Sequence, residues 1–154
     1  MIINKGHEYF TRLQMVVKCR AKRNKRYALT YIEVNKEHIV ATNGVVLGCL
    51  DNFGLEIGRY KCWSDSELID LQPIPISELK FPPYKEILPK RTCFYDVPDT
   101  VEKVLQECGR KGVIVVRENL EIFMKAKSFL IQGKSLPIVF FNTHFIGLVL
   151  PIMT

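Results

Sequence analysis

The sequence lacks the residue patterns on which most enzymes depend. It contains no G-x-S-x-G nucleophile turn, no G-x-x-x-x-G-K-S/T phosphate loop and no G-x-G-x-x-G dinucleotide fingerprint. The carboxylates Asp65, Glu67 and Asp70 cluster, but their spacing in a polar segment is typical of a solvated loop rather than of a two-metal nuclease. We therefore predict a protein that is not an enzyme.

Metal and disulfide patterns are also missing. The cysteines are odd in number, widely spaced and never in a C-x-x-C pair, which argues against a disulfide framework and a zinc cluster. The three histidines are equally scattered. We predict no metal, no cofactor and a reducing compartment. The cysteines are Cys19, Cys49, Cys62, Cys93 and Cys108, and the histidines are His7, His38 and His144.

No targeting or membrane segment is predicted. Met1 to Phe10 lacks the apolar stretch of a secretory signal, and the chain has no N-x-S/T acceptor site. Pro137 to Thr154 carries no full charge, but Asn142, Thr143 and His144 interrupt it, so two buried strands around a turn fit better than a membrane helix. We expect a cytoplasmic protein with no membrane contact.

The composition is that of an ordinary globular domain. With 154 residues, 47% of them hydrophobic and 25% charged, the chain predicts one domain over residues 1–154. The formal charge of +6 favours acidic partners. Seven basic residues and no acidic one lie between Arg12 and Arg26. This run predicts a polyanion-binding surface, and a solvated basic helix end is the alternative interpretation.

The pattern of apolar residues predicts an α+β fold with two helices packed on antiparallel β-meanders. A helix is expected from His7 to about Lys22, with apolar residues on one face and basic residues on the other. A second is expected over 98–110, where Asp99 and Glu102 have the spacing of a capping box. The predicted strands are 27–34, 38–42, 45–50, 55–63, 113–117, 120–125, 128–132, 138–141 and 145–150, with a hairpin turn at Asn43-Gly44. A proline-rich excursion over 64–90 resists assignment to a regular element.

Three short motifs along the chain point to one family. Ala41 to Leu47, A-T-N-G-V-V-L, is similar to the A-T-D-G-x-x-L turn of bacterial DNA sliding clamps, the beta subunits of DNA polymerase III. Phe81 to Pro89, F-P-P-Y-K-E-I-L-P, resembles their F-P-D-Y-x-x-V-L-P connector. Leu148 to Met153 resembles their V-V-M-P-M ending. The motifs occur in the right order and touch most of the chain, so the resemblance implies a clamp-like domain.

The resemblance implies two binding surfaces. The basic helix would meet the phosphates of double-stranded DNA without reading its sequence, through Arg12, Lys18, Lys22, Arg23, Lys25 and Arg26. A pocket for peptides of a polymerase or another replication protein would be built from Thr42, Gly44, Val45, Val46, Leu47, Pro82, Glu86, Ile87, Leu150, Pro151 and Ile152.

Several departures from the family keep alternatives open. Val45-Val46 stands where the family has His-Arg, and Glu86 replaces a basic residue, so the pocket is more apolar, altered in specificity or lost. The second predicted helix is poorly basic. Because clamps string three domains per chain, a ring would need about six copies of this one, as a homo-oligomer. The alternative function is a clamp-fold adaptor or inhibitor, encoded by a virus or mobile element, that does not encircle DNA.

Overall fold

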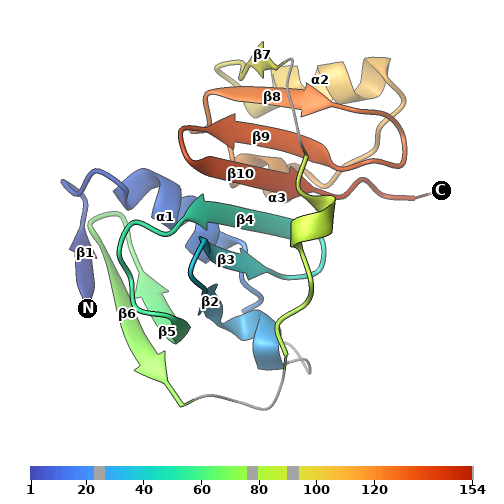
Figure 1. Ribbon diagram of the computed structural model, residues 1–154. Coiled ribbons are helices and arrows are strands. Elements are labelled where there is room, and N and C mark those ends of the chain that lie inside the picture. The colour runs from blue at the N-terminus through green and yellow to red at the C-terminus, as the bar shows by residue number, and fades with distance from the viewer. Residues whose placement is uncertain (23–26, 76–79, 90–93, 154) are drawn as a thin grey trace.

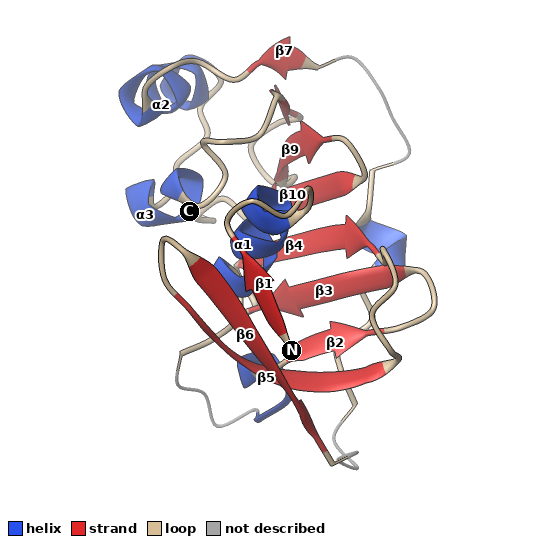
Figure 2. Cartoon of the chain, turned by 90° about the vertical axis from the view of Figure 1, so that its left-hand side faces the viewer, coloured by secondary structure: helices blue, strands red, loops and turns tan. Residues whose placement is uncertain are grey.

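One antiparallel sheet runs through the molecule, and the helices lie on one side of it (Figures 1 and 2). The structure is a computed structural model that describes residues 1–22, 27–75, 80–89 and 94–153. In chain order the elements are β1 (Ile2–Asn4), α1 (Phe10–Lys18), η1 (Tyr27–Thr30), β2 (Ile32–Val34), β3 (His38–Thr42), β4 (Val46–Asp51), β5 (Gly58–Ser64), β6 (Leu68–Ile74), η2 (Lys85–Ile87), β7 (Tyr95–Asp96), α2 (Val101–Arg110), α3 (Arg117–Glu121), β8 (Ser128–Ile131), β9 (Ile138–Asn142) and β10 (Phe145–Val149).

The sheet is built from two similar halves. Its strand order is β1-β6-β5-β2-β3-β4-β10-β9-β8-β7, so β2-β3-β4 on one side of the centre mirrors β10-β9-β8 on the other. Every strand pair is antiparallel. The predicted α+β class, with helices on antiparallel strands, is confirmed. The order also agrees with the internal pseudo-symmetry that the repeated helix-and-meander pattern suggests.

Two glycines face each other where the halves join. In the β4–β10 pair Gly48 lies opposite Gly147. A Cβ atom added to Gly48 would lie 3.0 Å from the Cα atom of Val16 in α1, and one added to Gly147 would lie 2.4 Å from the Cε1 atom of Phe123. The missing side chains therefore let α1 and the Phe123 ring pack directly on the backbone of the two central strands.

Helix α1 buries the face that its sequence predicts, but it is shorter than expected. Phe10, Leu13, Val16 and Val17 are buried, together with Met15. The helix ends at Lys18 rather than at Lys22, because the chain turns there and the Ala21 amide donates to the carbonyl of Leu29.

Helix α2 is capped by a residue that the capping-box pattern did not identify. The Thr100 hydroxyl accepts a hydrogen bond from the Lys103 amide, while Asp99 forms an ion pair with Lys103 at 2.7 Å. The helix continues through Gly109 to Arg110, and the chain leaves it at Gly112 with a φ of 71°. The N-cap is thus one residue later than predicted.

The predicted strands over 113–117 and 120–125 are wrong. Residues 113–116 have no regular structure, and α3 is followed by turns in which the Phe123 amide donates to Leu120 and the Ala126 amide donates to Phe123. Leu120, Phe123 and Ala126 are buried at a spacing of three residues, and the successive turns bring all three into the core.

The other predicted strands are present with shifted ends. The expected strands over 128–132, 138–141 and 145–150 correspond to β8, β9 and β10. Two others are shorter than predicted, since 27–30 forms η1 before β2 and since β5 begins at Gly58. The proline-rich excursion contains a strand, β6, which pairs with both β5 and β1, so the expectation of no regular element there is wrong.

A second apolar layer covers the sheet on the side away from the helices, which we call the outer face. Residues 81–89, the connector, cross this face and include η2 (Figure 2). Beneath them Val40, Leu47, Cys49, Val139 and Leu148 are buried with Tyr84 of the connector. Strands β3, β4, β9 and β10 are therefore buried on both faces at the centre of the sheet, which explains their nearly continuous apolar sequences.

The glycine pair predicts a sharp asymmetry between two glycine-to-alanine substitutions. Gly147→Ala should destabilise the protein by about 1 to 3 kcal/mol, because the fully buried Phe123 ring cannot move away from the new methyl group. Gly109→Ala is the control: no atom lies within 4 Å of its added Cβ, and alanine favours the helix by about 0.5 to 1 kcal/mol. Urea unfolding followed by circular dichroism measures both, and equal stability of Gly147→Ala and the wild type would contradict the packing described.

Candidate functional site

Three segments far apart in the sequence meet at one end of the central strand pair. They are the β3–β4 turn, the 3-10 helix η2 of the connector and the end of β10. Together they form a hollow of about 60 Å³, which we call the seam pocket. Its lining residues are Thr42, Gly44, Val45, Val46, Leu47, Ile87, Pro137, Leu148 and Leu150.

The β3–β4 turn is held in place by its own polar groups. The Thr42 hydroxyl donates to the Val46 carbonyl at 2.6 Å, and the Asn43 side-chain oxygen accepts from the amides of Val45 and Val46. Gly44 has a φ of 94°, a conformation that residues with a side chain rarely adopt. The Leu150 amide donates to the carbonyl of Val45 at 2.8 Å, which ties the end of β10 to the turn.

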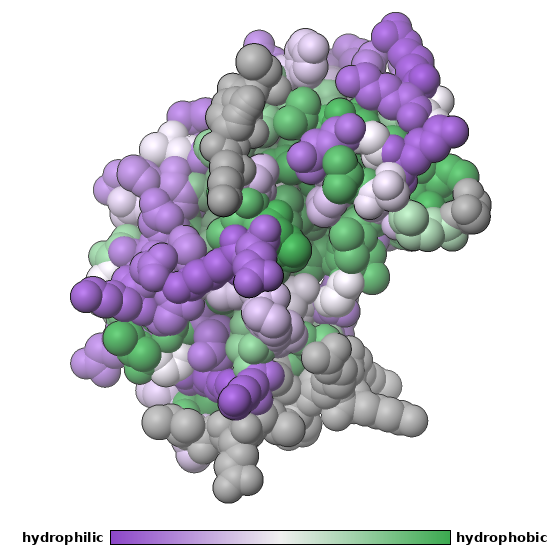
Figure 3. Space-filling model, turned by 45° about the vertical axis from the view of Figure 1, so that its right-hand side comes forward, coloured by the Kyte–Doolittle hydropathy of each residue, from purple (hydrophilic) through white to green (hydrophobic). Residues whose placement is uncertain are grey.

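The pocket has a buried floor and an exposed rim. Leu47 is 5% exposed and Leu148 is buried beside it in the outer-face layer, so these residues are core. Val45, Ile87 and Leu150 are 43%, 54% and 43% exposed. Space-filling Figure 3 shows apolar surface on the side of the molecule that carries the connector and the C-terminal end. A rim of this kind offers apolar contact area to another molecule.

Four of the predicted pocket residues lie outside the seam pocket. Pro151 is buried beyond the end of β10, and Ile152 is exposed, with its amide donating to the Ile114 carbonyl at 2.7 Å. Pro82 and Glu86 instead line a larger neighbouring hollow of about 470 Å³, which we call the connector hollow. Sequence reasoning in turn missed two lining residues. Pro137 directly precedes β9 and lies in none of the three motifs, whereas Leu148 of β10 opens the C-terminal motif but is not among the predicted pocket residues.

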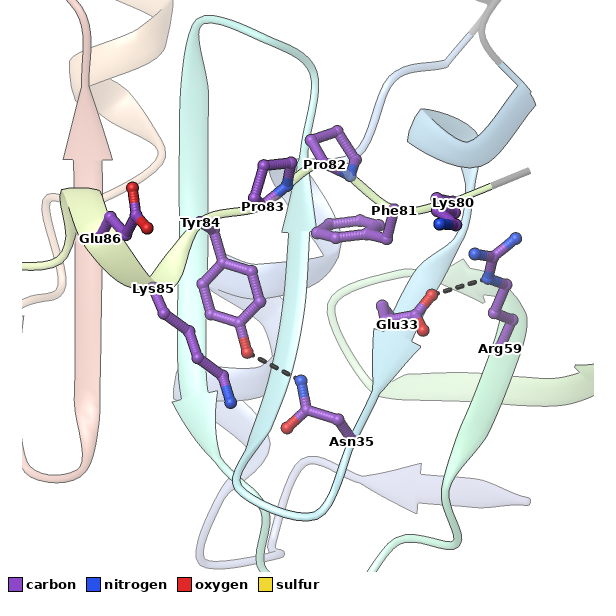
Figure 4. Close-up of a pocket in the computed structure, with 10 residues that line it drawn as sticks. All are labelled: Glu33, Asn35, Arg59, Lys80, Phe81, Pro82, Pro83, Tyr84, Lys85 and Glu86. Carbon is purple, nitrogen blue, oxygen red and sulfur yellow. Dashed lines mark hydrogen bonds and ion pairs between the residues drawn. The ribbon is translucent and has the colours of Figure 1, made fainter. Parts of the chain in front are cut away.

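Tyr84 fixes the connector between the two hollows. It is buried, and its hydroxyl accepts a hydrogen bond from the Asn35 side-chain amide (Figure 4). The same hydroxyl lies 2.8 Å from His38 Nδ1. Burial is the main cause that raises the pKa of Tyr84. Next to it Lys85 pairs with Glu37 at 2.8 Å, which lowers the pKa of the Glu37 carboxyl and raises that of Lys85. Tyr84 belongs to the F-P-P-Y motif, so a signal for it was present in the sequence.

In the described part of the predicted basic surface, one cation contacts other residues of the protein and two are exposed to solvent. Arg12 donates to the carbonyls of Thr143 and Glu8, and its guanidinium lies 4.5 Å from the centre of the Tyr9 ring. Lys18 and Lys22 are exposed. Arg23, Lys25 and Arg26 lie outside the described residues. Lys127, which sequence reasoning missed, donates to the Thr143 hydroxyl and so adds a cation beside Arg12.

The second half of the helix side is electrically neutralised. Lys103 pairs with Asp99, Arg110 pairs with Glu107, and Arg117 pairs with both Glu102 and Glu121. These ion pairs lower the pKa of Asp99 and of Glu102 and raise that of Arg117. The α2 and α3 surfaces therefore present little net positive charge, as the poorly basic sequence of the second helix indicates.

Metal-binding and membrane-spanning features are absent from the described residues. No group of three or more His, Cys, Asp or Glu side chains in the described ranges is arranged to hold a metal ion. No helix within those ranges is both long and apolar enough to cross a membrane. Cys19, Cys49, Cys62 and Cys108 are free thiols, and burial raises the pKa of Cys49 to about 12. Cys93 lies outside the described residues.

This sheet, with its helices on one side and a connector on the other, is the fold of bacterial DNA sliding clamps. The DNA polymerase sliding clamp of Pseudomonas aeruginosa matches with a TM-score of 0.59 at 11% identity, over 100% of this chain and 67% of the clamp. The Bacillus subtilis clamp matches with a TM-score of 0.57 at 10% identity, over 100% of this chain and 64% of the clamp. The beta subunit of DNA polymerase III from Thermotoga maritima gives 0.61 at 9% identity, over 100% and 65%.

The predicted clamp-like fold is confirmed by these matches. No protein-family model matches the sequence, and no curated protein matches it. The chain spans about two thirds of the length of the clamps, and at such low identity the likeness concerns the fold alone.

A glutamate should destabilise the protein strongly at the floor of the seam pocket and hardly at all at its rim. Leu47→Glu should destabilise the protein by more than about 3 kcal/mol, because it places a carboxylate in the layer between β4 and the connector. Val45→Glu should leave stability within about 0.5 kcal/mol, since this side chain is at the exposed rim. Thermal unfolding measures both variants. Equal destabilisation by the two would show that the rim is closed and that the seam pocket is ordinary core.

Proposed function

We propose that this protein is a non-catalytic clamp-fold protein of DNA replication or repair that docks a short apolar peptide segment of a partner in the seam pocket. The observation that carries the proposal is the convergence of the β3–β4 turn, Ile87 of the connector and Leu150 of β10 around one hollow. The three motifs that resemble sliding clamps all contribute to it.

The chemistry of the rim supports an apolar ligand. Val45, Ile87 and Leu150 are exposed without a charged side chain among the lining residues. Burying one such side chain against a partner removes apolar area from water, which favours the complex. The hollow itself is small, so we expect it to take one apolar side chain, while neighbouring residues of the peptide lie along the rim.

Griselimycin is a suitable probe, because one structure with this fold is a Pseudomonas aeruginosa clamp bound to it. We expect griselimycin to bind this protein and to bind at least tenfold more weakly to Ile87→Asp, since a carboxylate would be desolvated at the contact. Ile57→Asp is the matched control, because Ile57 is more exposed than Ile87 and does not line the pocket. Isothermal titration measures the affinities.

A peptide-display selection on the immobilised protein, counter-selected on Ile87→Asp, covers ligands that differ from griselimycin. We expect the selection to enrich peptides with apolar side chains, and we expect the Ile87→Asp variant not to retain these peptides. Failure of both probes to bind, or equal binding to Ile87→Asp and the wild type, would overturn the docking proposal.

A second part of the proposal is non-specific contact with double-stranded DNA through the basic residues at α1. Lys18 and Lys22 are exposed and Arg12 lies beside Lys127, which supports a positive surface on this half. The neutral α2 and α3 surfaces favour the alternative function, a clamp-fold adaptor that binds a protein and does not encircle DNA. DNA binding and its salt dependence distinguish the two.

If the α1 cations meet phosphates, affinity for a DNA duplex should be independent of sequence and should fall steeply with salt. Lys18→Gln with Lys22→Gln should lower the slope of log affinity against log salt by about 0.9 for each lysine removed. Lys61→Gln is the control with the same type of charge loss. It lies in β5 beside Cys62, which packs toward the helices, so Lys61 points to the other face.

Fluorescence anisotropy with two duplexes of unrelated sequence measures the slopes. An unchanged slope in the double variant, or no binding at low salt, would remove the role in DNA binding and leave the adaptor as the better interpretation.

A further inference from the structure

Beside the connector lies a hollow whose polar floor is incompletely satisfied. The connector hollow has a volume of about 470 Å³, several times that of the seam pocket. Figure 4 shows Arg59 of β5 and Glu33 of β2 on one side and the connector residues above them. The two are cross-strand partners in the β2–β5 pair.

The Arg59 guanidinium uses only part of its hydrogen-bonding capacity. Its Nε atom donates to Glu33 Oε2 at 2.7 Å, a contact on the side of the guanidinium. Nη1 is shielded from water and has no hydrogen-bond partner among the described residues. Buried donors without an acceptor are rare in native proteins, and such a group calls for an explanation. Arg59 also lines the hollow, so a rotation of its guanidinium toward the hollow would let Nη1 donate to a ligand oxygen there.

The remaining walls indicate the class of ligand. Phe81, Pro82 and Pro83 are stiff apolar groups above the guanidinium, and they suit an organic ligand better than a bare ion. Two of the lining cations are already paired, Arg59 with Glu33 and Lys85 with Glu37. Lys80 adds a positive charge and Glu86 a negative one. This nearly balanced charge disfavours a doubly charged phosphate, while a single carboxylate matches the planar fork of a guanidinium.

We infer that the connector hollow binds a carboxylate side chain of an acidic peptide from a partner protein. Arg59 would donate hydrogen bonds to this carboxylate, and Lys80 would lie at the mouth of the hollow. The prolines and Phe81 would contact the apolar part of the peptide next to the carboxylate. This site lies on the other side of Tyr84 from the seam pocket and shares none of its lining residues. It therefore goes beyond the docking function proposed above.

The test uses a fluorescein-labelled, C-terminally amidated peptide with a single glutamate, Gly-Pro-Glu-Pro-Gly, and its counterpart with glutamine in place of glutamate. We expect the acidic peptide to bind the full chain and the glutamine peptide to bind at least about tenfold more weakly, measured by anisotropy. Arg59→Lys keeps the charge opposite Glu33 but loses the fork, and it should weaken binding of the acidic peptide about tenfold.

A matched pair of charge reversals separates the hollow from general attraction to a basic protein. Lys80→Glu and Lys134→Glu change the net charge equally, and both residues are exposed. Only Lys80→Glu should weaken the peptide, about tenfold, while Lys134→Glu should change affinity less than twofold. Because Lys80 is on the surface, this pair tests the proposal even if Arg59→Lys does not fold.

Equal weakening by Lys80→Glu and Lys134→Glu, equal binding of the two peptides, or no binding at millimolar peptide would overturn the inference. Displacement of the acidic peptide by inorganic phosphate at tenfold lower concentration than by acetate would show a phosphate site instead. Ile87→Asp should leave this binding intact, so failure of the seam pocket and failure of the connector hollow are distinguishable.

Discussion

At Gly48 and Gly147 the helix layer packs directly on the backbone of the central strands, because glycine has no side chain. The rest of the structure depends on this contact. Residues at these two positions lie opposite one another at the join of the halves. Without a Cβ on either, Val16 of α1 and the Phe123 ring approach the strands closely enough to close one continuous core. A well-packed core tolerates few added atoms, so this closeness sets the position of α1 relative to the sheet.

The same join explains why the candidate site lies where it does. Because β4 pairs with β10, the turn before β4 and the chain after β10 come to the same end of the sheet, where the Leu150 amide bonds to Val45. The connector has to cross the outer face to reach the second half, and Tyr84 anchors it there through Asn35 and His38. Ile87 is thereby placed beside the turn. The site is a consequence of topology as much as of the residues that line it.

Much of the fold could be predicted from local patterns, and the errors have a common cause. The apolar face of α1 and the hairpins β3–β4 and β9–β10 follow from spacing and turn residues that act within a few positions. Residues 120–125 are predicted as a strand because four of the six are apolar, yet the Phe123 amide bonds to Leu120 in a turn after α3. The Phe123 ring packs on Gly147, a contact distant in sequence that no local pattern indicates. Strand β6 likewise depends on partners β1 and β5, and its proline at position 73 conceals it.

For the site, the motifs identified the segments that meet, but not which of their residues line the seam pocket and which line the connector hollow. Thr42, Gly44, Ile87 and Leu150 could be named from the resemblance, and they do line one pocket. Pro82 and Glu86 belong to the same connector motif, yet they face the neighbouring hollow, because η2 turns the chain between Tyr84 and Leu88. The Arg59 nitrogen that lacks a partner among the described residues has no sequence signal, since it depends on the rotamer that Arg59 adopts toward Glu33.

The central strand pair also governs how the chain can reach its native state. Strands β4 and β10 are about a hundred residues apart along the chain, and closing so long a loop costs chain entropy before any contact offsets it. Until that closure each half presents an apolar strand with open hydrogen-bonding groups, β4 in one and β10 in the other, as an unprotected edge. We therefore expect the pairing of β4 with β10 to form late in folding, and we expect the open edges to favour aggregation until it does.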